Sequence, residues 1–454
     1  MDQLFWIMLL SLPCLIIPIK HLILLGVAGV ALADSRIVSY DFVYYLRFVP
    51  MGILCFRILA DLKFKKFIPK NFYYWVKVWT PFLMFALMSI TYSLRPSFST
   101  QRVLSAGFVL IGFGVGVPLY LETPKKITDI LYLVALVMGV AVLYSLYLAP
   151  QHESMPAGVQ DTERLYGVFR NPNTLGILAM QLVFVLIFFW QKRKEKFIGK
   201  FIFGIAVAAG VTLVVTGSRA SALGFTVGLL VVIIGYTRVQ KKTFSAIWSV
   251  LLVLMSISLV AGYFFPEYSG GLFRTDSAGR SFLWDWTWET YKNGPFWGVG
   301  YGNSTELFAR ETLYFRSNGI YAPDAHNSYL SLLLELGVVG LVFGLSGFAM
   351  IIIRAWKCLP YFEDPRLGVS LMAAVVASLV NAVFETWVFN FGNASTVPFW
   401  LFLGIISYQT AQAQIRIRYA SIHMCRSYFP GNAQAQIMKK MERGRPRVLD
   451  FKTD

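Results

Sequence analysis

Charged residues, cysteines and histidines are all scarce in this sequence. Charged side chains make up 14% of the 454 residues, against about 25% in ordinary soluble domains, which excludes a large soluble protein. The 4 cysteines show no paired spacing, so neither a disulfide framework nor a zinc site is predicted. No HExxH or DxD motif occurs either, and we therefore expect no metal ion and no other cofactor.

Long apolar runs dominate the chain instead. Hydrophobic residues make up 56% of it and the mean hydropathy is +0.59, values typical of a polytopic membrane protein. A helix needs roughly 17 to 25 apolar residues to cross a bilayer. The runs that reach or approach this length are 43–60, 75–92, 103–121, 127–148, 175–190, 201–216, 220–236, 244–265, 328–353, 367–388 and 396–408.

These runs predict an all-α polytopic membrane protein with about 12 transmembrane helices. The segment 4–33 is interrupted by two prolines and a lysine, so it forms either one broken span or two short ones. The chain start, MDQLFWIMLL, lacks the basic residues of a cleavable signal peptide, and none is expected. We divide the chain into a transmembrane domain, 1–408, and a basic tail, 409–454.

The net charge of +17 is segregated along the chain. Basic clusters fall at 63–70, 192–200 and 238–242, and an even number of predicted spans separates each cluster from the next. The positive-inside rule therefore places these clusters and the tail, 409–454, in the cytoplasm. Contact with anionic membrane lipid explains this basic excess. No nucleic-acid-binding motif is present, and we do not expect nucleic acid to bind.

One outer connection, 266–327, is much longer than the others and forms one large extracytoplasmic loop in this topology. It contains seven acidic and five basic side chains, so it lacks the positive excess of the cytoplasmic face. Four tryptophans and many other aromatic residues would allow it to bury apolar surface and fold over the membrane. A basic side chain on this face therefore indicates local chemistry.

Four arginines stand out on the outer side. Arg219 lies in a very short turn between two apolar runs, Arg280 lies in the large loop, and Arg164 and Arg170 flank the segment YGVF. One guanidinium group can bind two phosphate oxygens at once, and it stays charged at any working pH. These arginines therefore predict a site for a lipid-linked diphosphate. The alternative roles are contact with lipid head groups, helix capping and, for Arg280, a surface ion pair with a nearby aspartate.

His326 opens the apolar stretch HNSYLSLLLELGVVG. On an ideal helix Gly337 and Gly340 share the face of the histidine, whereas Glu335 lies opposite and does not pair with it. The imidazole is a candidate proton acceptor, because its ordinary pKa of about 6.5 lets it take a proton near neutral pH. The alternative is a capped helix whose two glycines let a neighbouring helix approach closely.

Five segments carry a family resemblance. His326 and Asn327 fit a pattern of histidine, then asparagine, serine or glutamine, then nine residues and GxxG, and here the chain resembles bacterial O-antigen ligases. Asn171 and Asn173 lie in the segment 164–176, and we interpret both as helix caps. The segments that resemble the wider O-antigen and exopolysaccharide polymerase and ligase family are RLYGVFRNPNTLG (164–176), TGSRAS (216–221), AGRSFLW (278–284) and GPFWGVGYGN (294–303).

The resemblance implies a metal-independent, inverting glycosyltransferase of the bacterial inner membrane whose active site faces the periplasm. It would move a glycan from a polyprenyl (undecaprenyl) diphosphate carrier to a saccharide acceptor in O-antigen or exopolysaccharide synthesis. Carried over to this chain, Arg219 and Arg280 would hold the donor diphosphate, Arg164 or Arg170 would add a lesser contact, and His326 would act on the acceptor. A flippase and a chain-length regulator would be family-level partners.

Three alternatives remain open from the sequence. A polymerase would use another lipid-linked repeat as the acceptor, whereas a ligase would use lipid A-core, the base of lipopolysaccharide. Glu335 and Glu385, in or near predicted spans, also fit a membrane transporter of a small solute such as inorganic carbon. A metal-dependent glycosyltransferase would use an acidic residue in the first outer loop, where Asp34 and Asp41 lie.

Overall fold

The structure is a computed structural model that describes residues 17–36, 48–64, 70–114, 116, 123–148, 164–193, 197–240, 279–320 and 324–428. Within these residues the chain is helical apart from turns and loops, and it forms no strand. An isolated antiparallel bridge joins Ser35 to Phe169. The all-helical fold predicted from the sequence is therefore confirmed for the described part of the chain.

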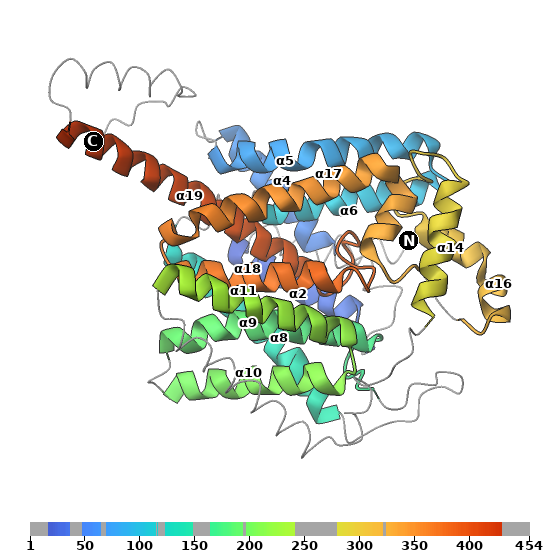
Figure 1. Cartoon of the computed structure of the whole chain (residues 1–454), viewed down its shortest axis with the longest axis horizontal. Coiled ribbons are helices and arrows are strands. Elements are labelled where there is room, and N and C mark those ends of the chain that lie inside the picture. Colours follow the sequence, from blue (N-terminus) through green and yellow to red (C-terminus); the bar gives the residue numbers. More distant parts are fainter. Residues whose placement is uncertain are drawn as a thin grey trace.

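Most of the long helices lie side by side with similar axis directions (Figure 1). The first half of the chain contributes α2 (Ile19–Ala33), α4 (Val49–Phe64), α5 (Lys70–Met88), η1 (Ser89–Tyr92), α6 (Pro96–Gly114), α8 (Pro124–Leu148), α9 (Pro172–Arg193), α10 (Phe197–Val215) and α11 (Arg219–Gln240). The second half contributes α14 (Arg280–Lys292), α15 (Ser304–Arg310), α16 (Thr312–Ser317), α17 (Ser328–Cys358), η4 (Leu359–Tyr361), α18 (Pro365–Asn381) and α19 (Thr396–Tyr428).

Five helices in the described residues are long and apolar enough to cross a membrane. Each coincides with a span predicted from the sequence, so the described residues have the helical composition of a membrane protein, as predicted. The predicted span 244–265 lies outside the described residues. The five helices are Pro124–Leu148, Pro172–Lys192, Phe197–Val215, Arg219–Val239 and Ser328–Tyr361.

One predicted span, 367–388, is wrong at its C-terminal end. The helix α18 stops at Asn381, and residues 382–395 form turns. The segment AVFETWV is apolar enough to continue a span, but its Glu385 carboxylate finds polar partners only if the chain leaves the helix. The backbone amides of Trp387 and Val388 then donate to the hydroxyl of Ser328 at 3.0 and 3.3 Å, which replaces the helical hydrogen bonds they lose.

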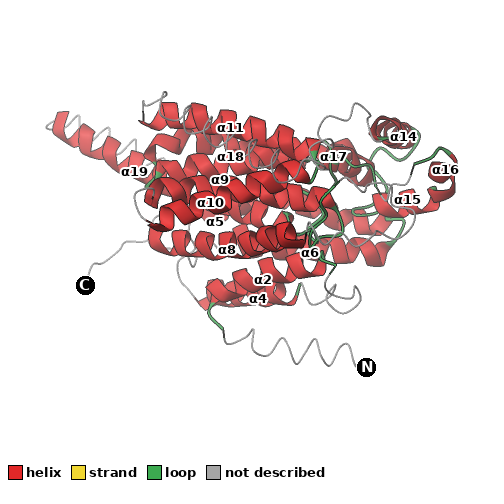
Figure 2. Cartoon of the chain, turned by 90° about the horizontal axis from the view of Figure 1, so that it is seen from below, coloured by secondary structure: helices red, strands yellow, loops and turns green. Residues whose placement is uncertain are grey.

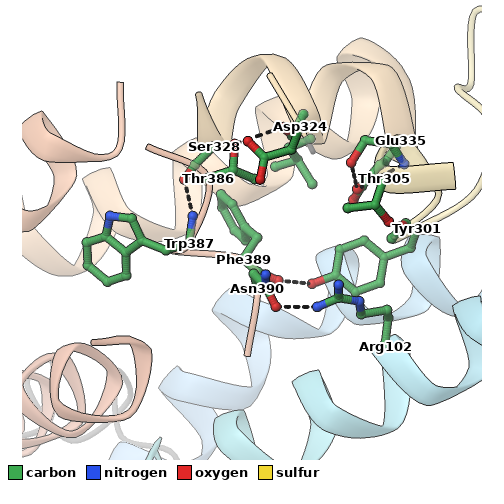
Figure 3. A pocket seen from close by; sticks show the side chains of 14 residues that line it. Arg102, Tyr301, Thr305, Asp324, Ser328, Glu335, Thr386, Trp387, Phe389 and Asn390 are labelled. Atoms are coloured by element: carbon green, nitrogen blue, oxygen red, sulfur yellow. Dashed lines mark hydrogen bonds between the residues drawn. The ribbon is translucent and has the colours of Figure 1, made fainter. Parts of the chain in front are cut away.

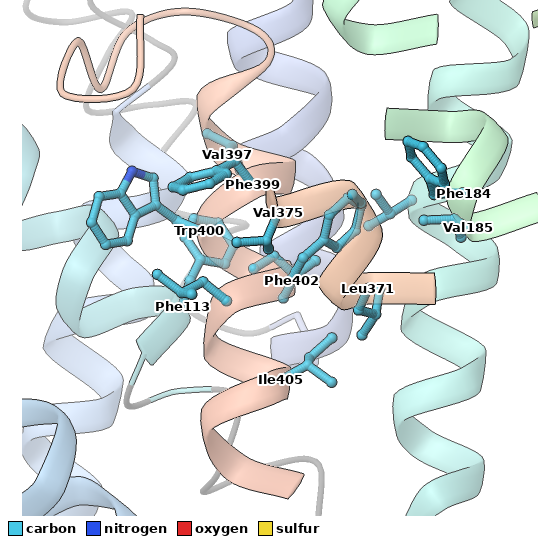
Figure 4. Close-up of a cluster of buried hydrophobic side chains, with 14 of the residues drawn as sticks. Phe113, Phe184, Val185, Leu371, Val375, Val397, Phe399, Trp400, Phe402 and Ile405 are labelled. Atoms are coloured by element: carbon cyan, nitrogen blue, oxygen red, sulfur yellow. The ribbon is translucent and has the colours of Figure 1, made fainter. Parts of the chain in front are cut away.

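The centre of the bundle is formed by α9 and α18. The helix α9 packs against α8, α10, α11 and α18, and 94% of its candidate span is buried. Figure 4 shows Leu371 and Val375 of α18 between Phe184 of α9 and the side chains of α19. At the contact of α11 with α18, a Cβ on Gly224 would lie 2.5 Å from the carbonyl oxygen of Ala377. Glycine is therefore required for this close approach.

The helices α14, α15 and α16 gather at one end of the bundle, and the C-terminal part of α19 lies at the other end (Figures 1 and 2). Leu283, Phe308, Phe315 and Leu334 form a separate buried cluster there, with Trp286 packed against it. This cluster joins α14, α15 and α16 to the start of α17. The described part of the predicted loop 266–327 therefore buries aromatic surface, as its composition predicted.

The helix α17 is broken at Gly337, whose φ of 62° and ψ of −171° are not helical. A Cβ here would lie 2.0 Å from the carbonyl oxygen of Phe296, so glycine lets a loop pass at this point. The amides of Val299 and Gly300 donate to α17 carbonyl groups at 3.1 and 2.9 Å. The ideal-helix argument is therefore wrong for Gly337, which meets a loop rather than a helix and lies beyond a break from His326.

Candidate active site

The candidate site forms around the carboxylate of Glu385, in the turn that follows α18. Its Oε1 accepts hydrogen bonds from Nη2 of Arg280 at 2.7 Å and from Nδ2 of Asn173 at 2.6 Å. Its Oε2 lies 3.5 Å from Nδ1 of His326. Glu385 is 5% exposed, and a buried carboxylate of this kind is tolerated only with such partners. Residues far apart in the sequence thus meet at one carboxylate.

His326 lies directly before α17 and between two carboxylates. Besides Glu385, the carboxylate of Asp324 lies 3.9 Å from Nδ1 and accepts from the His326 backbone amide at 2.7 Å. Within the described residues, His326 is the only non-glycine residue with a positive φ, at 46°. Such a conformation costs about 1–3 kcal/mol and is kept where the surroundings impose it. This strained turn fixes the position of the imidazole.

Arg164 joins the cluster through Asn173. Its Nη2 donates to Oδ1 of Asn173, and its Nε donates to the carbonyl of Thr216 at 2.9 Å. Because the same asparagine donates to Glu385, one amide connects the guanidinium to the carboxylate. Asn171 caps α9 by accepting from the Asn173 amide at 2.8 Å, and this cap holds Asn173 in the first turn.

Arg219 is the first residue of α11 and is half-buried. It follows directly on the turn whose Thr216 carbonyl accepts from Arg164. A second contact fixes the same helix start, because Nδ2 of Asn381 donates to Oγ of Ser221 at 3.0 Å. The backbone at Arg219 is therefore held by contacts of its neighbours Thr216 and Ser221 to Arg164 and to the end of α18.

The turn 382–388 is fastened to the start of α17. The hydroxyl of Ser328 donates to the Glu385 carbonyl at 2.7 Å, and the amide of Asn327 donates to Oγ1 of Thr386 at 2.9 Å. Asn327 also caps α17, since its side chain accepts two backbone amides of the first turn. These contacts fix the backbone at His326 relative to the backbone at Glu385.

Four helices begin around this cluster. The first residues are Pro172 in α9, Arg219 in α11, Arg280 in α14 and Ser328 in α17. The start of a helix carries partial positive charge, because its first amide groups have no partner within the helix. Together with the arginines and the imidazole, these helix starts make this end of the bundle favourable for an anion.

The electrostatics of the cluster favour ionised partners. Burial by itself would lower the pKa of His326, but the hydrogen bond and charge of Glu385, with the charge of Asp324, raise that pKa to about 9. Burial pushes the pKa of Glu385 upward, but His326, Arg280 and Arg164 hold it below its ordinary value. At neutral pH the imidazole is therefore protonated and the Glu385 carboxylate is ionised.

A small pocket lies next to the cluster. Figure 3 shows Asp324, Ser328 and Thr386 on one side of it and Tyr301 and Arg102 on the other. Its volume of about 30 Å³ is room for about two water molecules.

The two arginines of the first motif separate in the structure. Arg164 reaches the cluster through Asn173, whereas Nε of Arg170 donates to the carbonyl of Ser35 at 3.3 Å and its side chain is exposed. The geometry therefore favours Arg164 as the contact to a bound anion, a choice that the sequence left open. Arg280 pairs with Glu385 inside the cluster at 2.7 Å, whereas Asp276, one of the two aspartates considered as its surface partner, lies outside the described residues.

Two members of the cluster were not predicted. We interpreted Asn173 as a cap, but its side chain bridges Arg164 and Glu385, so that interpretation is wrong for Asn173 and confirmed for Asn171. The sequence related Glu385 to transport because it lies in an apolar segment. A carboxylate in such a segment does indicate a buried partner, but the identity of the partner required the structure.

The metal-dependent alternative finds no ligand set here. Among the described residues, no group of three or more His, Cys, Asp or Glu side chains could hold a metal ion. The carboxylate of Asp34 accepts from the amide of Ala394 at 3.2 Å, which is a structural contact. Asp41 lies outside the described residues.

Comparison with known proteins agrees with the sequence motifs. Residues 204–345 match the model of a family described as O-antigen ligase, and this range contains Arg219, Arg280 and His326. The chain is also 22% identical over 277 residues to an O-antigen ligase of Pseudomonas aeruginosa, in a match that covers 61% of this chain and 63% of that protein. It thus spans less than two thirds of the relative. The predicted resemblance to O-antigen ligases is confirmed, and residues 204–345 are the part of the chain that matches the family model.

Proposed function

We propose that this protein transfers a glycan from a polyprenyl diphosphate carrier to a saccharide acceptor at the periplasmic face of the bacterial inner membrane. The observation that carries the proposal is the meeting of Arg164, Arg280 and His326 at the buried carboxylate of Glu385. Fixed cations and a proton acceptor are the two components that such a transfer requires. The similarity of residues 204–345 to O-antigen ligases supports the same activity.

The diphosphate of the donor is assigned to Arg280, Arg219 and Arg164, in a region where four helices begin. As the bond between the sugar and the diphosphate breaks, negative charge grows on the leaving group. Guanidinium groups fixed at that position lower the barrier, by roughly 3–4 kcal/mol for each well-placed donor. Because these cations do the work that a metal ion does in other glycosyltransferases, we propose a metal-independent reaction.

His326 is assigned to the acceptor. An acceptor hydroxyl oxygen attacks the anomeric carbon opposite the diphosphate, and the bond between that carbon and the diphosphate breaks as the new bond forms. The hydroxyl proton passes to Nε2 of the neutral form of His326, whose Nδ1 keeps its own proton and faces Glu385. The polyprenyl diphosphate leaves with the electron pair of the broken bond. A single displacement of this kind inverts the anomeric centre.

The membrane topology is part of the same proposal. About 12 transmembrane helices would place the loop 266–327 in the periplasm and the basic tail 409–454 in the cytoplasm. In support, α14, α15 and α16 lie at the end of the bundle opposite to the C-terminal part of α19 (Figure 1). The cluster at Glu385 lies at the same end as α14, because Arg280 begins that helix.

We favour ligase over polymerase, because both the family and the relative carry the name O-antigen ligase. The acceptor would then be lipid A-core, whereas a polymerase would use a second lipid-linked repeat. A small-solute transporter is less well supported, because the Glu385 carboxylate is occupied by three side chains at one end of the bundle. Flippase and chain-length regulator stay family-level expectations for partners.

A transfer assay tests this function. The purified protein is mixed with an undecaprenyl diphosphate glycan and either lipid A-core or a second lipid-linked repeat, with EDTA present throughout. We expect the glycan on lipid A-core, and an inverted linkage by NMR. A ladder on the carrier lipid would identify a polymerase instead. Loss of all product in EDTA that returns with added metal would contradict metal independence, and absence of product in every condition would contradict transfer.

A further inference from the structure

Glu385 joins the groups that the proposed function assigns to different substrates. Arg280 and Asn173 bind its Oε1 at 2.7 and 2.6 Å, and His326 faces its Oε2 at 3.5 Å. The exposed fractions of the side chains are 7% for Glu385, 18% for Arg280 and 23% for His326. The same carboxylate is therefore the counter-ion of a proposed donor residue and of a proposed acceptor residue.

The contact between Arg280 and Glu385 uses only part of what a guanidinium offers. Nη2 of Arg280 donates to Oε1, which is a single hydrogen bond, although a guanidinium has five N–H donors and binds anions best in pairs. Oε1 is also shared with Asn173. A phosphate that takes two nitrogens of Arg280 would bind it more strongly than this carboxylate does.

The charges around Glu385 also indicate that this carboxylate competes with an added anion. Arg164, Arg280 and His326 surround one buried carboxylate, with Asp324 at the edge. Cations brought this close need a counter-ion, because like charges repel strongly where water is excluded. Without a negative charge at residue 385, the cations would attract an added anion more strongly.

We propose that Glu385 is a positioning residue that acts as a substitute anion: it holds Arg280 until the donor's diphosphate displaces it there, and it keeps His326 in place throughout. This inference rests on the proposed function. Donor binding is then an exchange of one anion for another at Arg280. The carboxylate thus weakens donor binding while it supports the later transfer to the acceptor, two effects of opposite sign.

The exchange also selects between phosphates. A diphosphate reaches several cations at once and so displaces a carboxylate from one of them. A monophosphate reaches fewer cations, so the competing carboxylate excludes it more effectively. Glu385 therefore favours the diphosphate carrier over the polyprenyl monophosphate, and loss of its charge should narrow that preference.

Binding and transfer are measured on the full-length protein in nanodiscs, with undecaprenyl diphosphate and undecaprenyl monophosphate as probes. For Glu385→Gln we expect the Kd of the diphosphate to fall about tenfold, which is the usual weight of one charge-assisted hydrogen bond. We expect the Kd of the monophosphate to fall further, and transfer to slow by about 10- to 100-fold. Glu385→Ala removes the same charge if the glutamine variant does not fold.

The control is Glu306→Gln, which removes one negative charge from a residue that pairs with Arg95 and Arg310 outside the cluster. Its Kd values should equal those of the unmodified protein. Equal tightening in both variants would reveal a long-range charge effect and overturn the inference, as would weaker or unchanged diphosphate binding in the Glu385 variants, or an unchanged preference between the two phosphates. If the unmodified protein does not bind undecaprenyl diphosphate, the proposed donor itself is wrong.

Discussion

Short polar side chains set the distances between the charged groups of the site. Asn173 holds Arg164 and Glu385 at one spacing, and Asp324 fixes the backbone of His326 through its amide. In each of these three contacts, at least one partner is the short side chain of an asparagine or an aspartate. Substitutions that keep charge but change length should therefore be as harmful as those that remove charge.

His326→Ala should reduce transfer by about 10²- to 10⁴-fold, the range usual for a positioned proton acceptor. The protein should still fold, because the Glu385 carboxylate keeps Arg280 and Asn173 as partners when the imidazole is lost. Transfer in the assay above and protein abundance in the membrane are measured together. Unchanged transfer at normal abundance would show that another group takes the proton.

The transfer rate of the unmodified protein should rise with pH. The proton goes to the neutral imidazole, and the pKa of His326 is raised to about 9, so the neutral fraction grows about tenfold per pH unit until that value. We would measure kcat/KM for transfer from pH 6 to pH 10. A rate that falls over this range would assign a protonated His326 to the diphosphate instead.

The same raised pKa links folding to pH with a definite sign. The folded value of about 9 lies above the ordinary value of 6.5, so the folded protein binds the proton more tightly than the unfolded chain does. The pair of His326 with Glu385 therefore contributes its full stabilisation below about pH 6.5 and loses it as the pH rises through about 9. A high pH therefore raises the transfer rate but lowers the contribution of the His326–Glu385 pair to the stability of the fold.

Arg219→Lys should impair transfer severely although the charge is kept. A lysine ammonium is a point donor and cannot bind two phosphate oxygens in the planar geometry of a guanidinium. We expect a loss of at least about 100-fold in kcat/KM, from the loss of one transition-state contact. Arg310→Lys, at an exposed arginine paired with Glu306, is the matched control. Full activity of Arg219→Lys would reduce Arg219 to a membrane anchor.

At the scale of helices, the geometry of the site depends on where the helices end or break, rather than on how long they are. The apolar runs predicted where α8 to α11 and α17 lie, because hydrophobic length depends on the bilayer alone. The end of α18 at Asn381 and the break at Gly337 could not be predicted, since both depend on distant partners. Trp387 and Ser328 fix the first, and the carbonyl of Phe296 fixes the second.

Gly337→Ala should destabilise the protein by roughly 2 kcal/mol or more, because the new Cβ meets a backbone oxygen and the backbone has a positive φ. The loop at Phe296 would have to move away from α17, and transfer should fall with it. Gly204→Ala is the control, because a Cβ there meets nothing within 4 Å. Thermal unfolding of the two variants in detergent is compared. An equal unfolding temperature would show that the loop yields freely.

At the scale of the whole molecule, composition alone predicted the class of the fold, whereas the orientation that we infer from charge segregation stays a prediction. The cluster could be predicted only in part: Arg219, Arg280 and His326 lie in recognisable motifs, whereas Glu385 lies 59 residues after His326 in the chain. Pairing between such distant residues depends on how the helices pack, and no local pattern encodes it.

The orientation predicts opposite accessibility at the two ends of the bundle. Leu313 in α16 is 80% exposed and Tyr419 in α19 is 64% exposed. With the native cysteines replaced by serine, Leu313→Cys should react with a membrane-impermeant maleimide in cells with a permeable outer membrane. Tyr419→Cys should react only after the inner membrane is opened. The reverse pattern would invert the proposed topology.

The position of Glu385 has a consequence for biosynthesis. The ribosome makes Arg280 and His326 well before the turn 382–388, whose Glu385 pairs with both of them. Until this turn is made, the nascent protein carries Arg280 and His326 without the Glu385 carboxylate, and the start of α17 lacks the hydrogen bonds that Ser328 and Asn327 make to the turn. The site is therefore completed only after α18 and the turn 382–388 have been made, and a chain truncated after α17 would lack the carboxylate that pairs with Arg280 and His326.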